Sequence, residues 1–101
     1  MNTEKIYISG RISGIENEAE KLFNEAEIYL KKNNPNAEIF NPMKEFPFVK
    51  GKTWEQYMLD DIKLLFNCTT IFMLNNWHVS VGARIEHNIA VNTGKRIIFQ
   101  F

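Results

Sequence analysis

Residues 69–101 read TTIFMLNNWHVSVGARIEHNIAVNTGKRIIFQF and predict a strand, a helix and a second strand in succession. The segment TTIFML (69–74) is an uninterrupted strand-forming run, which is typical of a strand buried on both faces of a sheet. Ser80 is a helix cap, Gly94 ends the helix, and RIIFQF (96–101) supplies the next strand. Two strands joined through a helix in this way are parallel, with a right-handed crossover.

The same alternation runs through the rest of the chain. KIYIS (5–9) and AEIF (37–40) predict two further strands, and a helix is expected from about Trp54 to Phe66. An earlier helix is expected to start near Asn17, which is a plausible cap. Its apolar stripe consists of Ala19, Leu22, Phe23, Ala26 and Leu30. We therefore predict one α/β domain over residues 1–101, of the flavodoxin or Rossmann type, with a parallel sheet of about four strands flanked by three helices.

The composition narrows the class of protein and of partner. Twelve basic and twelve acidic residues cancel in a chain of 101 residues, so no charge pattern suits a nucleic acid polymer or a membrane surface. Cys68 is the single cysteine, which fits a reducing cytoplasm. The N-terminal segment is too short and polar for a signal peptide, and no run has membrane-spanning length. We expect a cytoplasmic domain whose ligand is a small molecule.

Glu86 lies on the inward side of the helix that follows Ser80. Winding this segment at about 100° per residue places Glu86 between Ile89 and Ala90, away from the polar stripe on the same helix. A carboxylate in such a place is costly unless it has partners or a task.

Asp61 raises the same question on the helix over residues 54–66. It falls inside the apolar stripe with Met58 and Leu65, whereas its neighbour Asp60 falls on the solvated side. Burial raises the pKa of a carboxyl, and a second carboxylate nearby raises it further. Either residue alone could be a structural carboxylate paired with an arginine or a backbone amide. Because two such carboxylates lie on helices that flank one sheet, a catalytic role for the pair is as plausible as a structural one.

Ligands of parallel α/β sheets bind beyond the carboxyl ends of the strands. Several candidate binding residues come directly after predicted strands in this sequence. The loop GRISG (10–14) could cradle a phosphate with its backbone amides and offer Arg11 as a cation, or could be a plain turn. Ser80 presents a hydroxyl and free amides at a helix start, which suits an anion, although the spacing alone favours a simple cap.

Two interpretations are possible for each of three other residues. Gly82 lies one turn before Glu86, where a missing side chain gives a ligand room or lets a helix approach a strand closely. Trp77 could stack on a base or close the edge of the sheet. His87 has no metal-ligand spacing to other residues, so we interpret it as a surface or packing residue, and we predict no metal site.

Three segments together resemble the nucleoside 2-deoxyribosyltransferase superfamily. They are KIYISGRISG, W..YM..DI..L..C..I.ML..W and S.GA..E...A...GK.I, and they cover nearly the whole chain. The resemblance is to its short phage and bacterial branch, and to the related deoxynucleoside 5′-monophosphate N-glycosidases. Its most specific part is the spacing of Ser80, Gly82, Glu86, Gly94 and Lys95. One departure is Thr69, where many relatives have an aspartate.

The resemblance implies roles for particular residues. Glu86 matches the glutamate that attacks the anomeric carbon of the sugar, and Asp61 matches the aspartate that handles the proton of the departing base. Ser80 matches the serine that contacts a 5′-phosphate. The substrate-binding set that we predict consists of Tyr7, Gly10, Arg11, Ile12, Gly14, Trp77, Ser80 and Gly82.

The function implied is cleavage, or transfer, of the N-glycosidic bond of a 2′-deoxynucleoside or its 5′-monophosphate. No metal or organic cofactor is needed, because a protonated base leaves readily. The resemblance also implies a homodimer or a higher homo-oligomer. The longer transferases continue past the position of Phe101, which favours cleavage over transfer. The alternative is a protein that binds a nucleotide, or a nucleotide-derived signal, without turnover.

Overall fold

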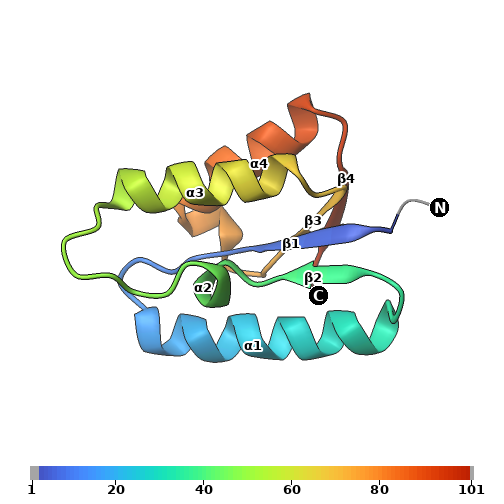
Figure 1. The fold of residues 1–101 in the computed structure, drawn as a ribbon, viewed down its shortest axis with the longest axis horizontal. Coiled ribbons are helices and arrows are strands. Elements are labelled where there is room, and N and C mark those ends of the chain that lie inside the picture. Colours follow the sequence, from blue (N-terminus) through green and yellow to red (C-terminus); the bar gives the residue numbers. More distant parts are fainter. Residues whose placement is uncertain (1–2, 101) are drawn as a thin grey trace.

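The strands of the sheet are all parallel and follow the order β2-β1-β3-β4 in the computed structural model of the chain (Figure 1). They are β1 (Lys5–Ser9), β2 (Glu38–Phe40), β3 (Thr70–Met73) and β4 (Arg96–Phe99). β1 lies inside the sheet, where Tyr7 is in register with Phe40 on one side and with Ile71 on the other. The predicted α/β fold with a parallel sheet of about four strands is confirmed.

The structure describes residues 3–100. Two sequence predictions extend beyond this range: the domain over residues 1–101 and the last strand, whose final residue Phe101 lies outside the described residues. Within residues 3–100, no helix has both the length and the apolar character needed to cross a membrane.

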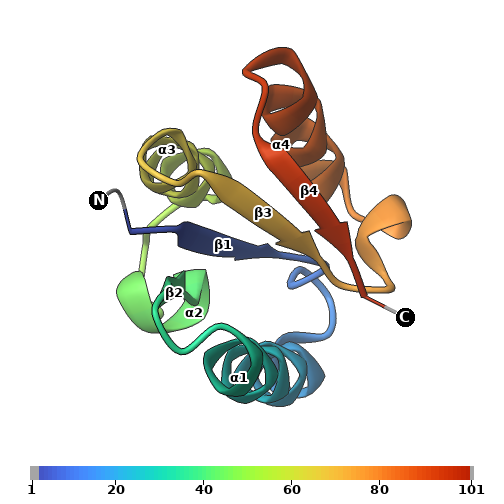
Figure 2. The same cartoon turned by 90° about the vertical axis from the view of Figure 1, so that its right-hand side faces the viewer.

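Helices cover both faces of the sheet (Figure 2). α1 (Glu16–Asn33) and the single turn α2 (Pro42–Glu45) lie on one face. α3 (Trp54–Phe66) and α4 (Val81–Asn92) lie on the other, and a short 3-10 turn, η1 (Trp77–Val79), precedes α4.

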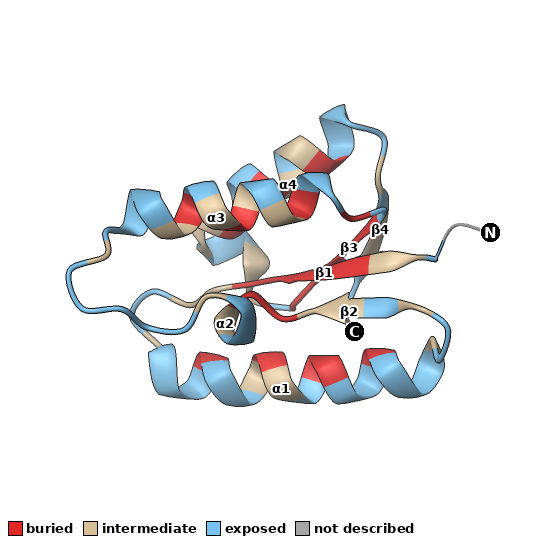
Figure 3. Cartoon of the chain, viewed as in Figure 1, coloured by how far each residue is buried: buried red, intermediate tan, exposed pale blue. Residues whose placement is uncertain are grey.

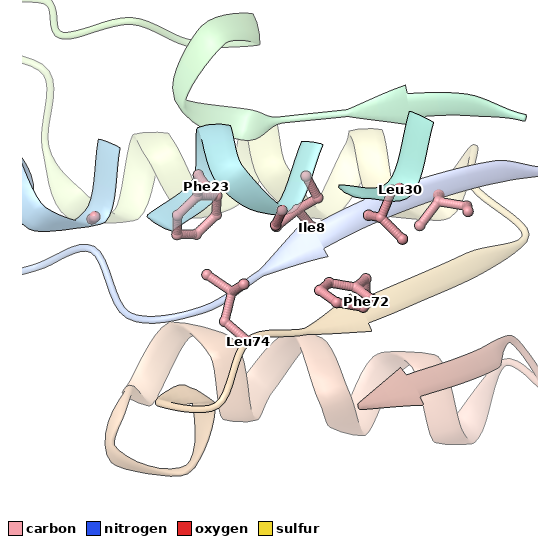
Figure 4. Close-up of a cluster of buried hydrophobic side chains, with 8 residues drawn as sticks. Ile8, Phe23, Leu30, Phe72 and Leu74 are labelled. Carbon is pink, nitrogen blue, oxygen red and sulfur yellow. The ribbon is translucent and has the colours of Figure 1, made fainter. Parts of the chain in front are cut away.

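Alternate residues of β1 face opposite helical layers, because side chains of a strand point to its two faces in turn. Ile6 and Ile8 face α1 and contribute to a core cluster that also holds Phe23, Leu30, Phe72 and Leu74 (Figure 4). Tyr7 belongs to a second cluster under α3 and α4, with Leu65, Cys68, Ile71, Met73, Ala83 and Ala90. Every residue of β3 is buried, as its continuous apolar run predicts, and the buried positions form inward stripes on the helices (Figure 3).

Two predictions about the helices are wrong. The described residues hold four α-helices rather than three, because the segment between β2 and α3, where no helix was predicted, contains α2. The Asn41 side chain caps this turn by accepting from the Met43 amide at 3.1 Å, and a single turn is too short to show a helical period. α1 also begins at Glu16, with Ile15 rather than Asn17 at its cap position.

Gly10→Ala is expected to destabilise the fold by about 1–3 kcal/mol, which is the usual range for overpacking in a dense core. A methyl group there would lie 2.6 Å from Leu74 Cδ1 and 2.9 Å from Leu74 Cβ. Urea denaturation should show a lower midpoint. The double variant Gly10→Ala/Leu74→Ala should cost less than the sum of the two single changes, since the second removes the clash. Strict additivity would contradict this account.

Candidate active site

A pocket of about 1180 Å³ opens beyond the carboxyl end of β1. Its wall combines the end of β1, the loop over residues 10–13, the segment that holds α2, and the first turns of α1, α3 and α4. Of the predicted site residues, the structure brings eight to this wall: Tyr7, Gly10, Arg11, Ile12, Asp61, Ser80, Gly82 and Glu86. These residues come from four separate elements, so the pocket exists only in the folded chain.

Glu86 projects from α4 and is held by hydroxyl groups on both of its oxygens. Tyr7 Oη donates to Glu86 Oε2 at 2.8 Å, and Ser9 Oγ donates to Oε1 at 2.7 Å. The glutamate is 4% exposed, and both donors are also buried. The inward placement predicted for Glu86 is therefore confirmed, and its carboxylate plane is fixed from β1.

Asp61 projects from α3 into the same pocket and is 9% exposed, which confirms its predicted burial. Thr53 and Gln56 form a capping box that fixes the start of this helix. Among residues 3–100, no group donates a hydrogen bond to the carboxyl of Asp61, which borders the pocket. Asp60 lies outside the pocket wall and is paired with Lys52 at 2.5 Å.

The two buried carboxyls are electrostatically coupled. Burial raises the pKa of Asp61 to about 7, and the charge of Asp60 adds to the rise while that of Lys52 opposes it. Burial raises the pKa of Glu86 to about 8, with a further rise from the charge of Asp61 and opposition from the hydroxyls of Ser9 and Tyr7. The pair therefore retains a proton near neutral pH.

This burial predicts a protein that loses stability as the pH rises. A carboxyl with a raised folded-state pKa stabilises the fold fully below its unfolded value, near 4, and loses that contribution as the pH rises through the folded value. We expect the unfolding free energy to fall by on the order of 3 kcal/mol between pH 5 and pH 9. Urea denaturation across this range measures it.

The double variant Asp61→Asn/Glu86→Gln provides the control for this pH dependence. It removes both carboxyls, so its stability should be nearly flat between pH 5 and pH 9, and it should exceed the wild type at pH 9. An equally steep decline in the double variant would show that other groups cause the pH dependence.

The structure supports part of each of the two interpretations of Ser80 and of Gly82. Ser80 Oγ accepts from the Ala83 amide at 3.1 Å, so Ser80 is a helix cap, and it also borders the pocket. A Cβ at Gly82 would lie 3.0 Å from Met58 Sδ, so this glycine permits the close approach of α3 and α4. Gly82 borders the pocket as well.

The loop over residues 10–14 is fixed by its own hydrogen bonds. The Arg11 amide donates to Asn76 Oδ1 at 3.0 Å, and the Gly14 amide donates to Glu16 Oε2 at 2.9 Å. Gly14 has φ +87°, which favours glycine, but it does not border the pocket. Its predicted place among the binding residues is therefore corrected to one that shapes the loop.

Trp77 also lies away from the pocket, so its predicted contact with a base is not supported by its position. Its ring stacks on His87 with centroids 4.5 Å apart, and Phe99 lies 5.9 Å away. These three aromatic residues cover the β4 side of the sheet. The alternative reading, closure of the sheet edge, is the one that the structure favours, and His87 packs as predicted.

Among the pocket residues that sequence reasoning missed, Ser9 and Lys52 bear most directly on the site. Ser9 follows Tyr7 by two positions on β1, so the strand period alone places both side chains on one face. Lys52 borders the pocket 4.3 Å from the centre of the Tyr57 ring, and no local pattern marks it. Within residues 3–100, no group of three His, Cys, Asp or Glu side chains is placed to hold a metal ion.

Comparison with known proteins gives a family and a fold. The model of a family described as Domain of unknown function (DUF4406) matches residues 4–99. A solved structure of 2-deoxyribosyltransferase from the psychrotolerant bacterium Bacillus psychrosaccharolyticus is similar, with a TM-score of 0.71 and 20% sequence identity. The similarity covers 94% of this chain and 70% of that chain. No protein of curated function matches the sequence. The fold implied by the sequence resemblance is thus confirmed.

Proposed function

The chain belongs to the DUF4406 family and has the fold of a 2-deoxyribosyltransferase, and from this premise we propose that it cleaves the N-glycosidic bond of a small 2′-deoxynucleoside or its 5′-monophosphate. One observation carries the proposal: two buried carboxyls from different helices, Glu86 and Asp61, border one pocket. Glu86 accepts a hydrogen bond on each carboxylate oxygen, whereas Asp61 accepts none from the described residues.

These different surroundings suit two different tasks. Two hydroxyl donors stabilise the ionised form of Glu86, whereas burial without a donor favours the protonated form of Asp61. Although burial raises the pKa of Glu86 above that of Asp61, we place the shared proton on Asp61, because only Glu86 has donors that stabilise its ionised form. A pair of carboxyls kept in opposite protonation states is the arrangement that retaining glycosidases use.

In the first step, Asp61 gives its proton to a ring nitrogen of the base as the bond from that base to C1′ breaks. The electron pair of this bond leaves with the base, and a Glu86 oxygen forms a new bond to C1′. The product is a deoxyribosyl ester and a neutral free base. Glu86 stabilises the positive charge that develops on the sugar before the new bond is complete.

In the second step, the ionised Asp61 takes a proton from water as the water oxygen attacks C1′. The ester bond breaks and its electron pair returns to Glu86, which restores both carboxyls. If a free base replaces water, the same step transfers the sugar. The residues supply all the acid and base chemistry, so the proposal requires no cofactor.

The remaining pocket residues are proposed to bind the sugar and its substituent. Gly82 borders the pocket one helical turn from Glu86, where the sugar would approach the carboxylate. Ser80 at the start of α4 and Arg11 from the loop offer a hydroxyl, free amides and a cation for a 5′-phosphate. Gly10 and Ile12 complete the sugar end of the pocket. The predicted homo-oligomer and the cytoplasmic location remain predictions.

Incubation with a panel of deoxynucleosides and their 5′-monophosphates, followed by chromatography for free base, tests the proposal. A second set of reactions contains a different free base, so that transfer appears as a new nucleoside. We expect base release from at least one member of the panel. Saturable calorimetric binding without any product would instead support the alternative, a nucleotide-binding protein without turnover.

A further inference from the structure

Ser9 occupies a position that the proposed chemistry does not yet explain. It is 1% exposed at the last position of β1, and its Oγ donates to Glu86 Oε1 at 2.7 Å. The Ser9 carbonyl accepts from the Leu74 amide at 2.8 Å, which anchors its backbone to the chain that follows β3. The hydroxyl is therefore rigidly aimed at one oxygen of the glutamate.

The groups that face Glu86 come from two other elements besides α4. From β1, Tyr7 Oη donates to Oε2, and burial together with the charge of Glu86 raises the pKa of this phenol well above its usual value, so it remains a donor. From α3, Asp61 contributes a negative charge when ionised. Ser9 and Tyr7 thus oppose protonation of Glu86, and burial and Asp61 promote it.

We propose that Ser9 is a positioning residue that keeps the negative charge of the carboxyl pair on Glu86 and the proton on Asp61. The assignment of nucleophile and acid to these two carboxyls rests on the proposed function, whereas the placement of the charge does not. Without the Ser9 hydroxyl, Glu86 keeps one donor in a buried site beside another carboxyl. The proton then moves toward Glu86, and the pocket loses both its nucleophile and its acid.

A structural role alone would have a different signature, and Thr70 provides the matched control. It is also 1% exposed, lies on the neighbouring strand β3, and donates its hydroxyl to a carboxylate, Glu4 Oε2, at 2.9 Å. Thr70 does not border the pocket. Thr70→Val therefore removes a partly buried hydroxyl–carboxylate hydrogen bond of similar length while leaving Glu86 untouched.

The experiment is a carboxyl NMR titration from pH 5 to pH 9 of protein labelled with ¹³C at the glutamate side chains. The Glu86 signal is identified by its loss in Glu86→Gln. We expect Ser9→Ala to move the Glu86 midpoint upward by about one pH unit, the usual effect of losing one hydrogen bond to a charged group. Ser9→Cys, which keeps the shape but donates weakly, should move it less, and Ser9→Thr should restore it.

The same variants should differ in catalysis. Ser9→Ala should shift the acid limb of the pH profile of kcat/KM upward by a similar amount, while Thr70→Val should shift neither the limb nor the Glu86 titration. An unmoved Glu86 midpoint in both Ser9→Ala and Ser9→Cys, or an equal movement in Thr70→Val, overturns the proposal. A moved midpoint in a protein that releases no base would overturn the proposed function and leave the placement of the charge standing.

Discussion

Glu86→Gln is expected to reduce base release by on the order of a thousandfold or more, because nucleophile and electrostatic stabilisation disappear together. The substitution keeps the size of the side chain, and one amide oxygen can still accept from Ser9 or Tyr7. Ligand binding should survive, since the proposed phosphate contacts involve Arg11 and Ser80. Base release and calorimetric binding are measured on the same preparation, with thermal melting to confirm folding.

Glu27→Gln is the matched control for this variant. Glu27 is also buried, at 7% exposed, but it lies on α1 outside the pocket wall. Burial opposes its ionisation, yet Lys31, Lys44 and Asn41 hydrogen-bond to it and hold its pKa at about 2. Its replacement should lower stability and leave turnover per folded molecule intact. If Glu86→Gln behaved like Glu27→Gln, Glu86 would be a structural carboxylate.

Asp61→Asn is expected to slow release of ordinary bases by about 10²–10⁴-fold, the range attributed to general acid catalysis. The asparagine cannot deliver a proton to the departing ring nitrogen. A deoxynucleoside of an N7-methylated purine carries its positive charge already and leaves as a neutral base without protonation. This variant should therefore cleave the methylated substrate far better than the unmethylated one, and the ratio of the two rates measures the need for an acid.

Asp60→Asn tests whether the adjacent carboxylate has been assigned correctly. Asp60 lies outside the pocket wall, where it forms an ion pair with Lys52, and its charge affects the pKa of Asp61. Its removal should change base release far less than Asp61→Asn, and it should not alter the preference for the methylated substrate. Equal losses of base release from both substitutions would show that the position of a carboxyl on the helix does not identify the general acid.

Much of the candidate site follows from local sequence patterns. The helical period alone places Asp61 and Glu86 inward and Asp60 outward, and the structure confirms all three placements. Ser80 is recognisable as a cap because its side chain bonds to an amide three residues later. Such features depend on neighbours within one or two turns, so the order of residues is sufficient to predict them.

Other features depended on contacts that no local pattern contains. α2 is a single turn, and α1 begins before its predicted cap, since such boundaries reflect particular backbone hydrogen bonds. Trp77 follows the end of a strand, where binding residues are common. Its ring nevertheless stacks on His87, on the β4 side of the sheet. The direction of a side chain beyond a strand is set by what packs against it.

The parallel α/β architecture and the burial of two carboxyls follow from the order of residues, because hydrophobic period and strand–helix alternation act over short distances. The groups that those carboxyls meet depend on how the elements pack together. Tyr7 and Ser9 are separated from Glu86 by 79 and 77 positions, and they reach it because the crossovers bring the end of β1 beneath α4. The same arrangement leaves Asp61 without a donor among the described residues. The difference between the two carboxyls, on which the proposed chemistry rests, is therefore a product of the fold.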